Sequence, residues 1–285
     1  MTGRRIVDAH HHLWDLTARP QPWITGAALA RLDRSFALAD LEPVARAAGV
    51  SATVVVQTVC VPEEAPELLA LAAEGGLIAG VVGWTDLTAP GVADTLARLR
   101  ELPGGDRLVG IRHQVQEEAD PHWLLRPDVR RGLLAVAEAG LAYDLVVKPH
   151  QLPAAVAAAA GLTGLTFVLD HLGKPPVATG VLEPWAGEVR RLAALPNTVC
   201  KLSGLLTEAA PGAWQVADLQ PYADVVLDAF GPQRLLFGSD WPVSTLEAGY
   251  DGSVLVADRL TAGLSESECD AVFRRNAERV YRLAR

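Results

Sequence analysis

The sequence predicts a single-domain (β/α)8 barrel, and three observations support this prediction. Short β-branched runs alternate along the chain with stretches rich in Ala, Leu, Arg and Glu. Two of these runs, at 53–56 and 167–169, are nearly continuously apolar, as in parallel strands that are covered on both faces. Eight runs of this kind match the eight strands of a barrel. Barrels often reach this length as one domain, so we expect one domain over residues 1–285.

The expected elements follow in order along the chain. The strands are expected at residues 5–10, 52–57, 78–84, 108–113, 142–147, 166–170, 198–203 and 234–239. After the fourth strand, Pro127 marks the start of a helix and Gly140 its end. The apolar face of this helix is expected to consist of Leu133, Leu134, Val136 and Ala137. A capping box at 265–268 begins the last helix, which we expect to run to about Leu283 and to pack against the outside of the sheet.

An open, doubly wound sheet is the alternative fold. Such a sheet usually carries a glycine-rich phosphate-binding loop after its first strand. In this chain that position holds His10, His11 and His12. The barrel is therefore the favoured fold.

Composition argues against several kinds of partner and environment. The net charge of −9 argues against nucleic acids and anionic membranes as partners. No secretory signal is evident and no apolar run approaches the ~18 residues of a membrane-spanning helix, so we expect a cytoplasmic protein. We expect this protein to be a monomer or a homodimer. The cysteines are far apart and odd in number, which predicts reduced thiols at Cys60, Cys200 and Cys269.

The carboxyl ends of the expected strands carry most of the side chains that could do chemistry. In a (β/α)8 barrel these ends build the active site. The candidates are His10, His12, Gln57, Trp84, Arg112, His113, Lys148, His150, Asp170, His171, Lys174, Lys201, Ser203 and Asp240. His10 and His12 are two residues apart on one strand, so both imidazoles point to the same side and can bind a metal. Asp240 ends a buried strand, where a carboxylate is costly unless it is paired or functional, which favours a metal ligand or a base for water.

Two of the histidines near these ends have structural alternatives. His11 points away from His10 and His12 and is expected to form a hydrogen bond within the barrel wall. Only one of Arg112 and His113 can face the pocket, and Arg112 is favoured because a guanidinium can bind carboxylates or hydroxyl groups.

Three further residues remain open on the sequence alone. Lys201 is either a salt-bridged wall residue or a substrate contact. Asp8 either orients a histidine or accepts hydrogen bonds from the backbone. His150 lies just beyond its strand and is a weaker candidate for the site.

Five segments together resemble the amidohydrolase superfamily. They are VDAHHHLWD at 7–15, GIRH at 110–113, LDHLGKP at 169–175, CKLSG at 200–204 and FGSDWP at 237–242. They are most similar to the amidohydrolase-related (amidohydrolase 2) sugar lactonases, the group that includes the L-fuconolactonases and L-rhamnonolactonases. The segments span nearly the whole chain in family order, and this ordered set is far more specific than any single motif.

The resemblance implies a barrel of the metal-dependent hydrolase type and a set of site residues. The implied catalytic set, which would also hold a single divalent ion, is His10, His12, His171 and Asp240. The expected substrate contacts are Arg112 and Lys174, implied by the resemblance, together with Gln57 and His150 from the strand ends and Trp14, Trp84 or Trp241 as flat faces for a sugar.

The chain departs from the two-metal members of the superfamily. Those members have a bridging lysine at the end of strand 4 and a histidine at strand 5. Here strand 4 ends in Arg112 and His113, and the strand 5 candidate, His150, is displaced. We therefore expect one zinc or manganese ion, or a reaction that requires no metal.

These expectations lead to one hypothesis and two rivals. The hypothesis is hydrolysis of an aldonolactone such as L-fuconolactone, with Asp240 as the base for water and the histidines, directly or through one ion, stabilising the oxyanion. One rival is a metal-dependent decarboxylase of an aromatic or unsaturated acid from the same superfamily. The other is a non-catalytic barrel that binds a sugar acid. The Gly173-Lys174 pair after His171 favours the lactonase.

Overall fold

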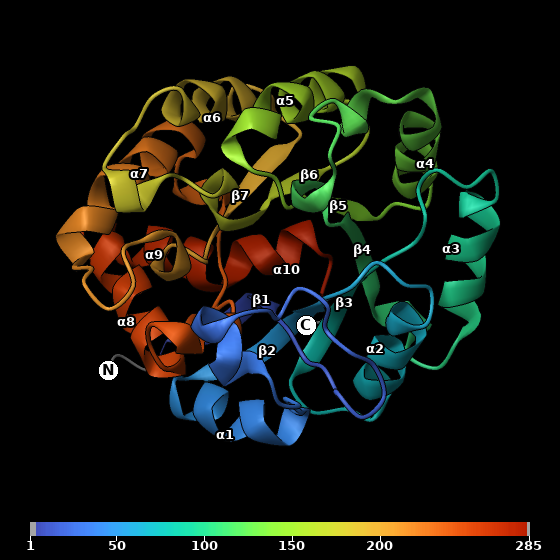
Figure 1. Cartoon of the computed structure of the whole chain (residues 1–285), viewed down its shortest axis with the longest axis horizontal. Helices are drawn as coiled ribbons and strands as arrows, with labels where there is room; N and C mark the ends of the chain where they lie inside the picture. The colour runs from blue at the N-terminus through green and yellow to red at the C-terminus, as the bar shows by residue number, and fades with distance from the viewer. Residues whose placement is uncertain (1–3, 284–285) are drawn as a thin grey trace.

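The computed structural model describes residues 4–283 and confirms the (β/α)8 barrel. Eight parallel strands pair in chain order, and a parallel bridge between His11 and Trp241 joins the last strand to the first. Figure 1 shows the helices arranged in a ring around these strands. All eight runs that the sequence predicts as strands are strands.

The strands are β1 (Ile6–His11), β2 (Val50–Val56), β3 (Ile78–Gly83), β4 (Leu108–His113), β5 (Ala142–Leu145), β6 (Phe167–Leu169), β7 (Thr198–Leu202) and β8 (Leu235–Phe237). The α-helices are α1 (Leu38–Ala47), α2 (Glu64–Ala73), α3 (Val92–Glu101), α4 (Pro127–Glu138), α5 (Leu152–Gly161), α6 (Trp185–Ala193), α7 (Val216–Phe230), α8 (Tyr250–Leu260), α9 (Glu266–Asp270) and α10 (Asn276–Val280). Short 3-10 turns lie in the loops, among them η1 (Ala27–Leu32), η6 (Asp170–Gly173) and η8 (Leu206–Glu208).

Strands β6 and β8 end earlier than the sequence predicts. The predicted strands include Asp170 and Ser239, whereas the observed strands stop at Leu169 and Phe237. Just beyond each of them the chain turns into the left-handed region, with φ of 52° at His171 and 55° at Asp240. The polar residues that follow these strands thus leave the extended conformation and turn toward the centre of the barrel.

Helix α4 begins at Pro127, and Gly140 follows its end with a φ of 67°, as predicted. Leu133 and Val136 are completely buried, but the prediction for Leu134 is wrong. Its side chain is 45% exposed, because it lies on the face of the helix turned away from the sheet.

The last helical segment has the predicted capping box but not the predicted position. The Ser265 hydroxyl accepts a hydrogen bond from the amide of Glu268, and the segment then passes through a π turn, Ala271–Arg275, into α10. Its end does not pack against the outside of the sheet. Ala277, Tyr281 and Leu283 join a cluster with the inward-facing Val7 and Val54 of the strands, and Figure 1 shows α10 crossing the centre of the ring of strands. This segment therefore closes one end of the barrel.

The cysteines and the helices bear on two further expectations from the sequence. Cys60, Cys200 and Cys269 are free thiols, as predicted. Within residues 4–283, no helix has the length and apolarity needed to cross a membrane.

Candidate active site

The four residues of the predicted catalytic set meet at the carboxyl ends of the strands. His10 lies in β1 and His12 directly follows this strand, His171 follows β6 and Asp240 follows β8. Nε2 of His10 lies 3.2 Å from Nε2 of His12. Asp240 Oδ1 lies 3.8, 3.6 and 3.9 Å from Nε2 of His10, His12 and His171 respectively. One carboxylate oxygen thus faces three imidazole rings.

Asp8 holds the end of β1 against the end of β8. Its carboxylate accepts hydrogen bonds from the amide of Ser239 at 2.8 Å, from the hydroxyl of Ser239 at 2.6 Å and from the hydroxyl of Tyr250 at 2.8 Å. It also accepts a bond from the amide of His10. Of the two alternatives for Asp8, the structure shows that it accepts bonds from backbone donors.

Left-handed backbone positions His171, and Gly204 and Gly238 lie directly against His171 and His10. His171, Leu172, Gly173 and Lys174 form a left-handed turn with φ between 52° and 72°. Such a turn is unfavourable for residues with a side chain and is maintained only by its surroundings. A Cβ atom on Gly204 would lie 2.4 Å from Nδ1 of His171, and one on Gly238 would lie 2.7 Å from Cβ of His10. Both imidazoles therefore pack directly on backbone.

The donor set fits a single divalent ion. Zinc binds imidazole nitrogen and carboxylate oxygen at about 2.0–2.2 Å in a tetrahedral arrangement, so that ligand atoms lie roughly 3.4 Å apart. The separations of 3.2 to 3.8 Å among His10, His12 and Asp240 agree with that arrangement. His171 lies 3.9 Å from Asp240 and completes the set on the other side of that carboxylate. His12 Nδ1 donates to the Val56 carbonyl at 2.8 Å, which leaves its Nε2 free as a ligand.

The carboxylate and imidazoles are almost completely buried, and burial changes their pKa values. Burial lowers the pKa of His171 to about 4, so this ring is neutral at pH 7. Burial alone would raise the pKa of Asp240, but the His171 and His12 rings hold it below its usual value. Asp240 is therefore an ionised carboxylate that can accept a proton.

Lys201 lies beneath the set as a completely buried cation. Its Nζ is 2.5 Å from Asp144 Oδ2, 2.9 Å from Asp170 Oδ1 and 3.0 Å from His10 Nδ1. Burial would raise the pKa of Asp170, but Lys201, His10 and Arg112 hold it well below its usual value. Of the two alternatives for Lys201, the structure shows a salt-bridged residue in the barrel interior.

Arg112 reaches the same network from β4. Its Nη1 donates to Asp170 Oδ2 at 3.0 Å and lies 3.4 Å from His10 Nε2. Its Nε donates to the Gln57 side-chain oxygen at 2.9 Å. Gln57 is completely buried and holds the guanidinium. Arg112 faces the site, whereas the neighbouring His113 turns away to stack on Trp123 at 4.2 Å.

A cavity of about 700 Å³ opens above the four residues. It is lined by His12, Trp23, Ala27, Ala28, Leu29, Arg31, Thr58, Arg112, Gln114, Gln116, Glu117, Val146, His171, Lys174, Thr207, Glu208, Pro211, Gly212, Asp240, Val243, Leu246 and Glu247. Lys174 and Arg112 therefore face the space in which a substrate would bind.

Several expected substrate contacts are not among these lining residues. Trp14 is buried, donates to the Arg34 carbonyl and packs edge-on against Trp23. Trp84 donates to His113 at 3.0 Å, outside the cavity. His150 is exposed, in a turn after β5. The aromatic side chain that lines the cavity is Trp23, which the sequence reasoning missed.

His11 and Trp241 also lie outside the set of residues that line the cavity. His11 bonds Thr53 Oγ1 at 2.9 Å in the barrel wall, as expected. Trp241 is buried and packs edge-on against Phe36.

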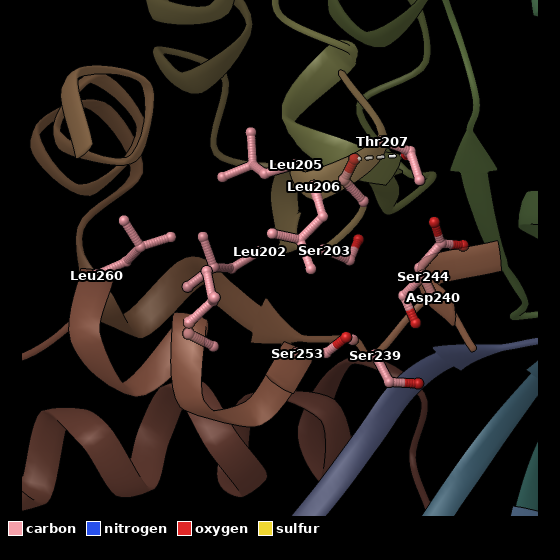
Figure 2. A pocket seen from close by; sticks show the side chains of 14 residues that line it. Leu202, Ser203, Leu205, Leu206, Thr207, Ser239, Asp240, Ser244, Ser253 and Leu260 are labelled. Carbon is pink, nitrogen blue, oxygen red and sulfur yellow. Dashed lines mark hydrogen bonds between the residues drawn. The ribbon is translucent and has the colours of Figure 1, made fainter. Parts of the chain in front are cut away.

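A second cavity, of about 30 Å³, lies behind Asp240. Figure 2 shows Ser203, Ser239, Ser244 and Asp240 around it, with Leu206 and Leu260 on the apolar side. Ser244 is buried, and its hydroxyl has no hydrogen-bond partner among residues 4–283. The cavity is mainly apolar but large enough for an ordered water molecule, and the Ser244 hydroxyl would be a polar partner for it.

Comparison with known proteins identifies relatives across nearly the whole chain. A family model described as Amidohydrolase matches residues 7–283. An L-fucono-1,5-lactonase from Burkholderia multivorans is 40% identical over 99% of this chain and 97% of its own. Another, from Burkholderia ambifaria, is 40% identical over 86% of this chain and 83% of its own. A crystal structure of an amidohydrolase from Burkholderia multivorans with bound zinc is 40% identical, covers 98% of this chain and 99% of that one, and superposes with a TM-score of 0.92.

Proposed function

This chain belongs to the amidohydrolase family, and we propose that it is a lactonase that hydrolyses the ring ester of a sugar-acid lactone. The observation that carries this proposal is the contact of the buried Asp240 with three imidazoles at the floor of a large cavity. The names of the relatives at 40% identity support L-fuconolactone as the substrate.

Asp240 acts as the base and then as the acid. It accepts a proton from water while the water oxygen attacks the carbonyl carbon of the lactone. The bond between that carbon and the ring oxygen then breaks, and Asp240 returns the proton to the departing ring oxygen. The product is an open-chain hydroxy acid.

His10 and His171 can stabilise the charge that develops on the carbonyl oxygen directly, whereas His12, whose proton is on Nδ1, would do so through a bound ion. His10, His12 and His171 surround the position next to Asp240, and stabilisation of this kind is often the largest catalytic contribution. One zinc or manganese ion held by these residues would polarise the carbonyl as a Lewis acid. Arg112 and Lys174 bind ring hydroxyls, and Trp23 offers its flat face to the sugar.

We expect purified protein to release acid from L-fuconolactone faster than from rhamnono-, galactono- or arabinono-lactones. A pH-indicator assay over this panel measures the rates. Absence of turnover on every lactone would contradict the proposal, and release of carbon dioxide from an aromatic acid would then favour the decarboxylase.

Removal of divalent ions is expected to lower turnover at least about tenfold, because the donor set fits one ion that would polarise the carbonyl. The rate is measured before and after dialysis against a chelator, and after addition of zinc or manganese. A rate that does not change after dialysis, with metal content checked by mass spectrometry, would show that the imidazoles and Arg112 act without a metal.

Gly204→Ala is expected to reduce kcat by about 100-fold, because a shift of the order of 1 Å in a catalytic group has an effect of this size. The new Cβ would lie 2.4 Å from Nδ1 of His171 and would displace this ring. The same nitrogen now contacts Ser203 Oγ at 2.9 Å. Gly180→Ala is the matched control: its φ of 69° is close to the 66° of Gly204, but its Cβ would meet no atom within 4 Å. Equal effects of the two substitutions would show that backbone strain, and not displacement of His171, is responsible.

A further inference from the structure

Lys174 and Glu208 form an ion pair on the wall of the active-site cavity. Lys174 ends the left-handed turn that carries His171, and Glu208 ends the 3-10 turn η8 after β7. Lys174 Nζ lies 2.5 Å from Glu208 Oε1, and the two side chains are 23% and 20% exposed. Both line the cavity beside Asp240. Within residues 4–283 neither side chain has another ion-pair partner.

This pair removes the positive charge that would otherwise bind an anion in the cavity. The other cation deep in the cavity is Arg112, which is neutralised by Asp170 at 3.0 Å. Arg31 also lines the cavity, but it is exposed on the 3-10 turn η1. Two further lining residues, Asp240 and Glu247, are acidic, whereas the acidic Glu117 is 59% exposed and paired with Lys148 at 3.8 Å. A ligand that carries a carboxylate would therefore meet paired cations and additional carboxylates.

The same pair offers hydrogen bonds to an uncharged ligand. Lys174 has three N–H donors, of which Glu208 Oε1 engages one, and Glu208 keeps its second oxygen as an acceptor. A hydroxyl group both donates and accepts, so adjacent hydroxyls can accept from Lys174 and donate to Glu208. Hydrogen bonds to charged partners of this kind are stronger than those between neutral groups.

We propose that Glu208 is a specificity-determining residue, which pairs with Lys174 to bind adjacent hydroxyls of an uncharged lactone and to reject lactones that carry a carboxylate. The inference rests on the proposed lactonase function and adds to it the charge class of the substrate. It predicts opposite effects of one substitution on two kinds of ligand.

Glu208→Gln is expected to raise KM for the neutral L-fuconolactone about tenfold, with a smaller change in kcat, because a charge-assisted hydrogen bond is lost. The same variant is expected to bind D-glucaro-1,4-lactone, which carries a carboxylate, about tenfold more tightly than the wild type, because Lys174 is then free to pair with it. Calorimetry measures this binding, and the initial-rate assay measures KM.

Two further variants make the test specific. Glu117→Gln removes a charge from the same cavity, where Glu117 lies 3.8 Å from Lys148, and is expected to change neither quantity more than about twofold. In the double variant Lys174→Met/Glu208→Gln the gain in binding of D-glucaro-1,4-lactone is expected to disappear, because the gain depends on Lys174.

Either an unchanged KM for L-fuconolactone or unchanged binding of D-glucaro-1,4-lactone in Glu208→Gln would overturn the inference. Failure of the proposed function looks different, since the wild type would then turn over no lactone of the panel. In that case the calorimetric comparison of the wild type, Glu208→Gln and the double variant still decides whether Glu208 excludes carboxylates.

Discussion

Asp240→Asn is expected to reduce kcat about 10³-fold on the lactone that the wild type hydrolyses best, because a positioned general base contributes about 10²–10⁴-fold. The substitution keeps the size of the side chain but removes the ionised carboxylate that faces all three imidazoles. The amide cannot accept the proton of the attacking water, and it is also a poorer ligand for a metal. The loss is expected in kcat more than in KM, since Asp240 acts on the water and not on the ring hydroxyls.

The control for Asp240→Asn is Glu117→Gln, which removes a carboxylate from the same cavity without touching the imidazoles. It is expected to retain turnover within about threefold, as for an exposed charge with a distant partner. Both variants are compared with the wild type in initial-rate assays, after their thermal unfolding has shown that they are folded. Near-normal turnover of Asp240→Asn would remove Asp240 from the role of base.

The barrel and the residues at its strand ends could be predicted because each depends on local sequence. Continuous apolar runs such as 167–169 identify buried parallel strands wherever they occur. In a barrel all carboxyl ends meet, so residues as distant in sequence as His10, His171 and Asp240 could be placed together without a model of the loops. The order of the strands is therefore enough to bring these residues together.

What could not be predicted depends on loops and on the curvature of the chain. Trp14 and Trp23 lie in the same long loop after β1, and only the fold of that loop decides which of them lines the cavity. Trp14 is buried and packs edge-on against Phe36, and it also packs edge-on against Trp23. The sequence signal was weak, because Trp23 follows a proline and no strand.

The partners of the ion pairs inside the barrel could not be predicted, although a salt-bridged Lys201 was one of two alternatives for this strand-end residue. Lys201 pairs with Asp144 and Asp170, and the sequence does not tell which of several acids a buried lysine will contact. Glu208 follows β7 by six residues, in a 3-10 turn whose path no periodicity indicates. Long-range pairing of charges is decided by the closed sheet as a whole.

Lys201→Met is expected to destabilise the protein by about 3–5 kcal/mol, the usual effect of removing one partner from a buried ion pair. Lys201, Asp144 and Asp170 are completely inaccessible to solvent, and without the ammonium the two carboxylates face each other with one remaining cation, Arg112. Thermal and urea unfolding of the wild type and the variant measure the effect. An unchanged unfolding midpoint would show that water or a proton replaces the ammonium at little cost.

The charge explanation can be separated from a packing explanation by a double-mutant cycle with Asp144→Asn. Asp144 is held by Lys201 at 2.5 Å and by the hydroxyl of Tyr281 at 2.8 Å, and burial already raises its pKa to about 6. If unpaired charge is the cause, Asp144→Asn should be less harmful in the Lys201→Met background than in the wild type, because it then removes an unpaired carboxylate. If lost packing is the cause, the two substitutions should add. A coupling above about 1 kcal/mol, which neighbouring residues in one network commonly show, would establish that Lys201 stabilises the barrel as the counter-ion of the two aspartates.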